Sequence, residues 1–519
     1  MIRKVMKTSM ILGILALSLC LTPGISGISN QQLIISHNQP ETLGGIPPME
    51  EWNKTFGGPE KDDAAYDVQQ TNDGGYIVAG YVKSFGVALW NPWLIKTDAQ
   101  GNEEWNVTYD YYSLPTVSGR AWSVQQTTDN GYILGCTFFN ATLFNSEKNR
   151  PYHKTNQGFL SSTVLIKTDA QGNEEWNSTY PGLNYSWCYS VHQTSDGGYI
   201  ATGGGNSSTE GSPELYLLKT HADGSLQWLQ TYGTSGMDEE GHMVQQTTDT
   251  GYIITGMSDC NYETDWGKLW LLKTDANGAM VWEKKFQGTK GDQRSWFENY
   301  GNSVQQTSDN GFIIAGIINY QSCLLKTDAN GNETWRKTPF LNDYSFFCYS
   351  GKQTIDGGYT ATCNGIIKTD AAGNEAWNIT IPTPFTAGQQ TSDGGYIIAG
   401  STAGYYNGDV WLIKFGPDPG TPALSFTITG GLGIHVQITN NGTADATNVP
   451  CEIHVQGGIL HRINQTAQET IDVPIGQTKT IETGMILGLG SIQVTVMVGE
   501  ETKSIEGTQL LIFSLLRKT

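Results

Sequence analysis

The chain has 519 residues, and its 63 glycines, 15 tryptophans and 24 tyrosines are typical of a protein with many tight turns and aromatic strand positions. A formal net charge of −20 repels phosphate backbones and disfavours nucleic acid as a partner. Long helical periodicity is missing after the first segment, which predicts an all-β protein.

The N-terminus has the pattern of a secretory signal peptide, which we predict over residues 1–29. Arg3, Lys4 and Lys7 precede an apolar run from Met10 to Leu21 that is too short to remain in a membrane. A linker is predicted over 30–50. No later stretch suggests a transmembrane span, so the sequence predicts a secreted or cell-surface protein.

Two phrases recur through the next part of the chain. One reads VQQTNDGGYIVAG from Val68, and its other copies begin at Val124, Val191, Val244, Val304, Gly351 and Gly388. The other reads LIKTDAQGNEEWN from Leu94 and returns unchanged from Leu165. Its lysine recurs at Lys96, Lys167, Lys219, Lys273, Lys326 and Lys368, with a degraded copy at Trp411. The units keep their sequence while their connections vary in length.

Each unit is predicted to form four strands. Val-Gln-Gln-Thr is the first, a tight Asp-Gly turn leads to the second, and Leu-Ile-Lys-Thr and the Trp-containing segment form the third and fourth. Such a period predicts a β-propeller. The last unit stops at Phe415 without a fourth strand, whereas an orphan fourth strand precedes the first unit at Glu51–Phe56. We therefore predict a seven-bladed β-propeller over 51–416, with the ring closed by the N-terminal outer strand.

Residues 417–423 are a linker by composition, and alternating strands follow. They predict a small Ig-like β-sandwich over 424–515.

These motifs resemble known families. The Leu-Ile-Lys-Thr-Asp-x-x-Gly-x-x-x-Trp hairpin resembles the repeat of PQQ-like propellers, and the whole unit with QQTSDGGYI resembles repeats of secreted prokaryotic surface proteins. The stretch ITNNGTADATNV from Ile438 resembles CARDB modules. The resemblance implies a propeller over about residues 50–416 and an adhesion-related sandwich, and it implies little about activity.

Most recurring side chains are interpreted as structural. We expect hydrogen bonds between blades from a ring of glutamines: Gln70, Gln126, Gln193, Gln246, Gln306, Gln353 and Gln390. We expect packing between blades from a set of tryptophans: Trp105, Trp176, Trp228, Trp282, Trp335 and Trp377. Asp73 and its six equivalents should bond their own turns. A polar channel lining remains the alternative for the glutamines.

Specific enzyme signatures are missing from the sequence. It has no vicinal Cys-Cys pair, no Asp box, no Gly-x-Ser-x-Gly elbow and no His-Glu-x-x-His stretch. The seven cysteines after the signal peptide have no metal-ligand spacing, so we expect mainly buried thiols and leave their pairing open. No metal or other cofactor is predicted, because the turn aspartates lack the dense acidic spacing of a Ca²⁺ loop.

The leading functional prediction is non-catalytic binding or adhesion at the cell surface, with a surface protein or a carbohydrate as the partner. An extracellular glycosidase or lyase with its site at the propeller entrance is one alternative. A purely architectural envelope or matrix component is another.

A ligand site is predicted where the connections vary in length. The second-to-third and fourth-to-first connections must lie on one face of the disc, and variable loops on a fixed scaffold often carry function. Residues that break the repeat just before the first strands combine aromatic and charged groups. The predicted site residues are Arg120, Trp122, Trp187, Glu240, His242, Arg294 and Trp296.

Four Asn-x-Ser/Thr sequons share one position in the repeat, directly after the fourth-strand tryptophan. They are Asn53, Asn106, Asn177 and Asn378. Side chains alternate along a strand, so the asparagine should face away from the tryptophan toward the outer edge. A glycan there would blunt an exposed edge strand, and we predict glycosylation at these sites.

Overall fold

The computed structural model describes much of the chain after the predicted signal peptide. The described residues are 47–58, 62–83, 90–110, 117–140, 161–183, 185–206, 212–261, 265–287, 299–319, 321–338, 348–381, 383, 385–403, 408–420, 422–442, 444–499, 501–511 and 513–516.

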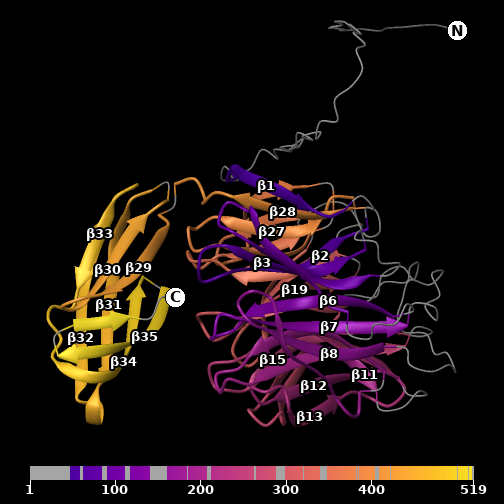
Figure 1. Ribbon diagram of the computed structural model, residues 1–519. Helices are drawn as coiled ribbons and strands as arrows, with labels where there is room; N and C mark the ends of the chain where they lie inside the picture. The colour runs from indigo at the N-terminus through magenta and orange to yellow at the C-terminus, as the bar shows by residue number, and fades with distance from the viewer. Residues whose placement is uncertain are drawn as a thin grey trace, which may run out of the picture. The chain divides into compact units, whose positions relative to one another are not determined.

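The first 28 strands form seven groups of four antiparallel strands (Figure 1). The first three groups are β2 (Ala64–Gln70), β3 (Tyr76–Val82), β4 (Asn91–Thr97) and β5 (Glu103–Thr108); β6 (Val117–Gln126), β7 (Tyr132–Asn140), β8 (Ser161–Thr168) and β9 (Glu174–Thr179); and β10 (Tyr185–Gln193), β11 (Tyr199–Asn206), β12 (Glu214–Thr220) and β13 (Leu226–Tyr232). The second and third of these groups are joined by one parallel pairing, between Ser161 and Tyr185.

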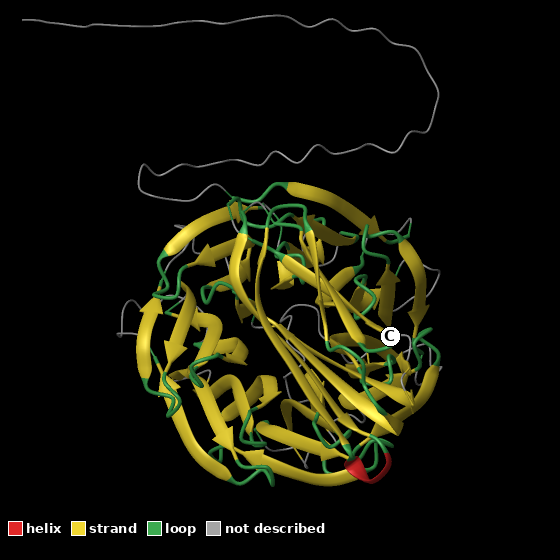
Figure 2. Cartoon of the chain, turned by 90° about the vertical axis from the view of Figure 1, so that its left-hand side faces the viewer, coloured by secondary structure: helices red, strands yellow, loops and turns green. Residues whose placement is uncertain are grey.

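The next three groups follow the same order. They are β14 (Asp238–Gln246), β15 (Tyr252–Asn261), β16 (Asp265–Thr274) and β17 (Met280–Phe286); β18 (Tyr300–Gln306), β19 (Phe312–Ile318), β20 (Gln321–Thr327) and β21 (Glu333–Lys337); and β22 (Ser350–Gln353), β23 (Tyr359–Cys363), β24 (Gly365–Thr369) and β25 (Glu375–Thr380). Figure 2 shows the groups arranged radially around a central axis, and the fold is all-β and propeller-like.

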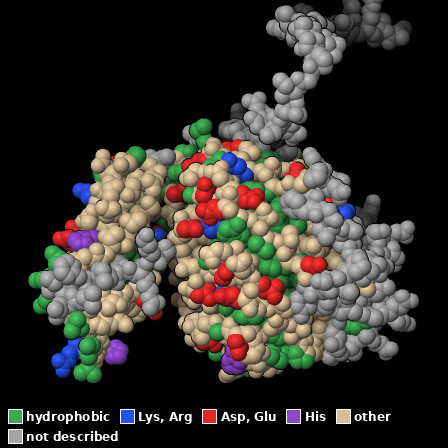
Figure 3. All heavy atoms as spheres, viewed as in Figure 1, with side chains coloured by type: hydrophobic (Ala, Val, Ile, Leu, Met, Phe, Trp, Pro, Cys, Tyr) green, Lys and Arg blue, Asp and Glu red, His purple; other side chains and the backbone are tan. Residues whose placement is uncertain are grey.

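The last group joins the two ends of the repeat array. It contains β26 (Phe385–Gln390), β27 (Tyr396–Ser401) and β28 (Val410–Phe415), and its fourth strand is β1 (Glu50–Phe56). Thr55 pairs with Trp411, as expected for the orphan strand. Figure 3 shows Asp and Glu side chains over the visible surface of these groups, in keeping with the net charge of −20.

The repeat tryptophans pack between neighbouring groups, as predicted. Each meets the aromatic ring that begins the second strand of the next group, at centroid distances of 5.2–6.0 Å. Six also cover a turn glycine: a Cβ on Gly101 would lie 2.5 Å from the ring of Trp52. The seventh, Trp377, donates its indole N–H to Asp418 at 2.9 Å, where the last group has no such turn. Glycine is thus required beneath the indoles.

The recurring lysine and turn aspartate form an ion pair in every group. The turn aspartate also accepts a hydrogen bond from the backbone two residues later, as Asp73 does from Gly75 at 3.0 Å. The lysine side chains are 2–8% exposed, and their Nζ atoms lie 2.7–2.9 Å from the aspartate oxygens. The pairs are Lys96–Asp73, Lys167–Asp129, Lys219–Asp196, Lys273–Asp249, Lys326–Asp309, Lys368–Asp356 and Lys414–Asp393. This pairing explains why the two phrases recur together.

The cysteines are mostly buried thiols. Cys348 and Cys363 form a disulfide. The other cysteines of the described residues are free and buried, as expected: Cys136, Cys188, Cys260, Cys323 and Cys451.

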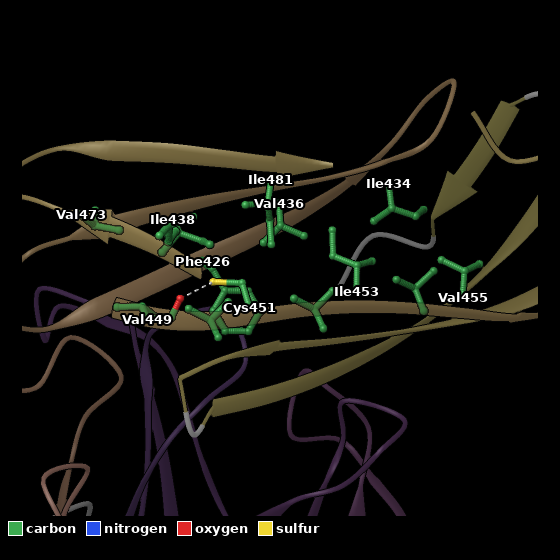
Figure 4. Packing of buried hydrophobic residues seen from close by; sticks show 14 of the residues in the cluster. Phe426, Ile434, Val436, Ile438, Val449, Cys451, Ile453, Val455, Val473 and Ile481 are labelled. Carbon is green, nitrogen blue, oxygen red and sulfur yellow. Dashed lines mark hydrogen bonds between the residues drawn. The ribbon is translucent and has the colours of Figure 1, made fainter. Parts of the chain in front are cut away.

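The C-terminal strands form two sheets that share one apolar core. A three-stranded sheet contains β29 (Leu424–Gly430), β30 (Ile434–Asn440) and β33 (Thr478–Glu482). A five-stranded sheet contains β31 (Ala446–Gly457), β32 (Ile463–Val473), β34 (Gly488–Val498), β35 (Glu501–Leu511) and β36 (Phe513–Leu516), and a 3₁₀ turn, η2 (Ile459–His461), connects β31 to β32. Figure 4 shows side chains of both sheets in the core, including Val436, Ile438, Ile453 and Val455.

Candidate functional site: the central channel

A cavity of about 140 Å³ lies where the first strands of all seven groups meet. Its lining comes from β2, β6, β10, β14, β18, β22 with the preceding Tyr349, and β26. The order of strands in each group therefore runs from this central channel to the rim. Residues near the start of a first strand lie toward the variable connections, and the Gln-Gln-Thr residues lie toward the short turns.

The inner edge of each first strand has backbone N–H groups without a strand partner, and side chains of neighbouring groups bind them. The second glutamine of each repeat accepts a hydrogen bond from the backbone N–H of the preceding group's turn. Seven such bonds of 2.8–2.9 Å link the seven groups: Gln126–Asn72, Gln193–Thr128, Gln246–Ser195, Gln306–Thr248, Gln353–Ser308, Gln390–Ile355 and Gln70–Ser392. The structural interpretation of these glutamines is confirmed, because they satisfy backbone N–H groups in the turns of the neighbouring groups.

The first glutamine of the repeat has a related role in four groups. Gln69, Gln125, Gln245 and Gln305 each accept a hydrogen bond from the first strand of the next group, at 2.5–2.8 Å. His192 and Lys352 occupy the equivalent positions in two other groups, and both line the channel. The side-chain pattern is therefore less symmetric than the strands that carry it.

The channel wall also contains a carboxylate. Asp67 lies two positions before Gln69, where four other groups have serine. Its Oδ2 accepts a hydrogen bond from the Val124 N–H at 2.9 Å, and its Oδ1 accepts one from Val68 at 2.9 Å. Among the described residues, the Lys352 ammonium has neither a hydrogen bond nor an ion pair within 4.0 Å. The charge of Asp67 nevertheless affects the pKa of Lys352. The channel thus contains an acidic and a basic side chain that interact through their charges without a direct contact.

Loss of water inside the channel shifts the pKa values of these groups. Burial raises the pKa of Asp67 to about 6, against the opposing effects of the Val124 N–H and of Lys352. Burial also lowers the pKa of Lys352, and the charge of Asp67 partly opposes this shift. Burial, with the charge of Lys352, lowers the pKa of His192 to about 4. Burial in the wall therefore favours the uncharged forms of Asp67, His192 and Lys352.

One end of the cavity is lined by residues that β-bulges add to the first strands. Register shifts place one extra residue at Tyr66, Trp122, Tyr189 and His242. A bulge re-aims the side chain of the extra residue. We call these four residues the aromatic collar. Their rings are in serial contact, with centroid distances of 4.1 Å, 5.4 Å and 5.1 Å.

The collar also offers polar atoms. The Trp122 Nε1 and His242 Nδ1 atoms are buried and have no hydrogen-bond partner among the described residues. The other ring nitrogen of His242 lies 3.4 Å from Glu240 Oε2. The Glu240 side chain is 5% exposed. Buried polar atoms are normally satisfied, so these two ring nitrogens are candidate contacts for a ligand.

The predicted site residues are only partly brought together. Trp122 and His242 line the channel, and Glu240 contacts His242. Arg120 lies behind the collar: it donates a hydrogen bond to the Tyr66 hydroxyl at 3.2 Å, and its guanidinium lies 4.9 Å from the Tyr81 ring centre. Trp187 is buried, at 5% exposure, and its ring lies close to Gly204. The predicted site residues Arg294 and Trp296 lie outside the described residues.

Sequence reasoning missed most residues of the channel, among them Tyr66, Asp67, Tyr189, His192 and Lys352. The signal for two of them was present, because VHQT and GKQT depart from the Gln-Gln-Thr pattern. Among the bulge residues, Trp122 and His242 were predicted, whereas Tyr66 and Tyr189 were not. Within the described part of the chain, no three His, Cys, Asp or Glu side chains are grouped to hold a metal ion. Nor do the described residues include a helix that is long and apolar enough to cross a membrane.

Comparisons with known proteins do not assign the chain to a family. No protein-family model and no curated protein matches the chain. Among solved structures, the WD40 domain of Neurospora crassa Pan2 has a TM-score of 0.44 at 8% identity, over 73% of this chain and 98% of that one. PorZ, a surface component of the type-IX secretion system of Porphyromonas gingivalis, has a TM-score of 0.42 at 8% identity, over 88% and 60%. Sqt1 of Chaetomium thermophilum has a TM-score of 0.40 at 9% identity, over 74% and 95%.

Proposed function

We propose that this protein is an exported, cell-surface binding or adhesion protein without catalytic activity. In this proposal the seven four-stranded groups are the blades of a propeller closed by β1, the C-terminal sheets are an Ig-like module of CARDB type, and the ligand enters the channel through the aromatic collar. The observation that supports it is the local loss of symmetry: the scaffold repeats, whereas Asp67, His192 and Lys352 and the collar do not.

The size of the cavity limits what can enter. The cavity has a volume of about 140 Å³. It admits one small group, such as a terminal sugar or a side chain of a larger ligand. The Trp122 and His242 nitrogens would contact hydroxyl or carbonyl groups of the ligand. A carboxylate or another anion on the inserted group would stabilise the charged form of Lys352, which burial disfavours in the channel, so we propose an anionic ligand.

Binding is favoured over turnover by the number of carboxylates. Glycoside hydrolysis usually needs two carboxyl groups across the scissile bond. Asp67 is the single carboxylate among the described residues that line the cavity. An extracellular carbohydrate-active enzyme with its site at the channel entrance and a purely architectural component are therefore the alternatives to test.

The test is a screen of the secreted chain, residues 30–519, on an array of neutral and acidic glycans, followed by calorimetry with any ligand found. Lys352→Gln restores the residue that five other groups carry, so the variant should fold while its affinity for an acidic ligand falls at least tenfold. Lys479→Gln, on an exposed position of the C-terminal sheets, is the matched control. Hydrolysis or elimination of any array polysaccharide would contradict the non-catalytic assignment, and equal binding by Lys352→Gln would contradict the channel site.

A further inference from the structure

The exposed apolar side chains of this protein are concentrated at one end of the C-terminal sheets. The described residues expose 12 large apolar side chains, and six of them lie at this end. We call these six residues the apolar tip. They are Leu432 (52% exposed), Ile459 (62%), Leu460 (77%), Met485 (58%), Leu487 (69%) and Leu489 (43%).

Backbone contacts hold the segments of the tip together. The N–H of Ile486 donates to the Leu432 carbonyl at 3.2 Å, which joins the β29–β30 and β33–β34 connections. The N–H of Gly458 donates to the Ser491 carbonyl at 2.7 Å, which joins the β31–β32 connection to the start of β34. Ile486 itself is 1% exposed and anchors its connection in the core. The tip is therefore one continuous surface formed by three connections.

The tip lies at the end of the sheets opposite to where the chain enters them. The linker leads into β29 at Leu424, and this strand ends at Gly430, next to the first tip residue. The antiparallel pairing brings the end of β31 and the start of β34 to the same end. Ile475, which is also exposed (51%), lies at the other end, where its N–H donates to Asp445.

The charge of the tip differs from that of the whole chain. Residues 431–433, 458–462 and 483–490 contain no Asp or Glu, although the chain has 50 acidic residues and a net charge of −20. They contain His461 and Arg462. The nearest acid along the chain, Glu482, is paired with His435 at 2.9 Å. Figure 3 shows apolar, basic and histidine side chains gathered at the lower end of the C-terminal sheets. An apolar surface with basic residues complements an anionic one.

The backbone of the tip holds an apolar side chain in water at a conformational cost. Leu460 and His461 have φ values of 60° and 53°, in the left-handed region that bulky residues avoid. Leu460 is the most exposed residue of the tip, so the strain is not offset by burial within the chain. Such strain is typical of positions retained for an interaction.

We propose that the apolar tip docks onto the surface of a lipid bilayer that contains anionic headgroups. The aliphatic side chains of the tip enter the boundary between headgroups and acyl chains, and Arg462 contacts the lipid phosphates. The protein then binds the membrane without spanning it, with the tip at the lipid surface. This inference does not depend on a ligand in the channel.

Vesicle co-sedimentation of the secreted chain, residues 30–519, tests the proposal. Wild-type protein should bind mixed vesicles of phosphatidylglycerol and phosphatidylcholine. It should bind vesicles of pure phosphatidylcholine more weakly, and high salt should weaken its binding to the mixed vesicles. Leu460→Asn, which suits a left-handed φ, and Leu487→Ser should each lower the partition coefficient at least tenfold, because one leucine side chain removed from an apolar phase accounts for that much. Arg462→Gln should lower it roughly fivefold on anionic vesicles.

Ile475→Ser is the matched control, because it removes an exposed aliphatic side chain (51% exposed) at the opposite end. It should leave vesicle binding unchanged, as should Lys352→Gln in the channel, which separates this proposal from the proposed function. Wild-type protein that fails to bind anionic vesicles would overturn the proposal, and so would binding that Leu460→Asn and Leu487→Ser leave intact. Self-association in sedimentation, lost in the same two variants without any vesicle binding, would assign the tip to a second copy of the chain instead.

Discussion

Ser392 donates its backbone N–H to the side-chain oxygen of Gln70 at 2.8 Å, across 322 positions of sequence. The same bond links successive groups, as between Asn72 and Gln126 at 2.8 Å. The first and last repeats therefore meet as any two neighbours do.

The strand that precedes the first repeat should contribute to the stability of the whole ring. Trp52 comes from β1, which pairs with β28, and its ring packs on Tyr76 and Gly101 of the first group. We expect Trp52→Ala to lower the free energy of unfolding by about 2–3 kcal/mol, somewhat below a fully buried tryptophan because this one is half-buried. Urea denaturation followed by tryptophan fluorescence measures the change. Glu50→Gln on the same strand should have almost no effect, and an equal loss in both variants would refute the assignment.

The glycines under the indole rings should be less tolerant than other turn glycines. Gly172 and Gly197 have similar positive φ values, 80° and 83°. A Cβ on Gly172 would lie 2.7 Å from the Trp105 ring, whereas a Cβ on Gly197 meets nothing within 4 Å. We expect both alanine variants to lose about 1 kcal/mol from backbone strain, and Gly172→Ala to lose a further 1–3 kcal/mol or so from displacement of the ring. Equal denaturation midpoints for the two variants would show that the indole does not need the glycine.

The repeated Lys–Asp pairs should make the protein sensitive to acid. Burial alone would raise the pKa of Asp196, but hydrogen bonds from Thr194, Lys219 and Gly198 outweigh it and lower the pKa to about 2. Because the folded-state pKa lies below the ordinary value of 3.8, the pair stabilises the fold fully above about pH 4 and is lost as the pH falls toward 2.

Asp196→Asn should therefore be less stable than wild type at pH 7, by about 1 kcal/mol after allowance for solvent screening of a half-exposed carboxylate. The difference should vanish near pH 2. Urea midpoints at several pH values report it, with Glu469→Gln as an exposed control. A difference that stays constant with pH would mean that the ion pair is not its cause.

Glycans should be found on at least two of Asn53, Asn106, Asn177 and Asn378 when the protein is taken from its native host. Their side chains lie on the fourth strands, and each donates a hydrogen bond to a glutamate three residues earlier, at 2.5–2.6 Å, instead of entering the tryptophan layer. Asn53 and Asn106 are the more exposed and should be occupied first. Peptide mass spectrometry settles the matter: four unmodified sites would mean that the recurrence is structural.

The sequence by itself determined the repeat unit and its ends. Tryptophan after the third-to-fourth turn, glycine in that turn and the Lys–Asp phrase all recur, and each copy meets nearly the same neighbours, so the local pattern already specifies the packing. The sequence also pointed to the observed pairing of β1 with β28, because the last repeat lacks a fourth strand after Phe415 and a spare fourth strand stands at Glu51–Phe56.

Only the tertiary structure decided which side chains face the axis. Asp67 and Lys352 lie in different groups far apart in sequence, and their mutual effect arises because the first strands converge on one channel. The bulges at Tyr66 and Trp122 shift the alternation of side chains by one residue. A bulge is a property of the pairing between two strands, so the period-two pattern of a single strand does not reveal it. The exposure of Leu460 could also not be read from the sequence, because an apolar residue between two strands does not show whether its backbone adopts a left-handed conformation or whether its side chain is covered.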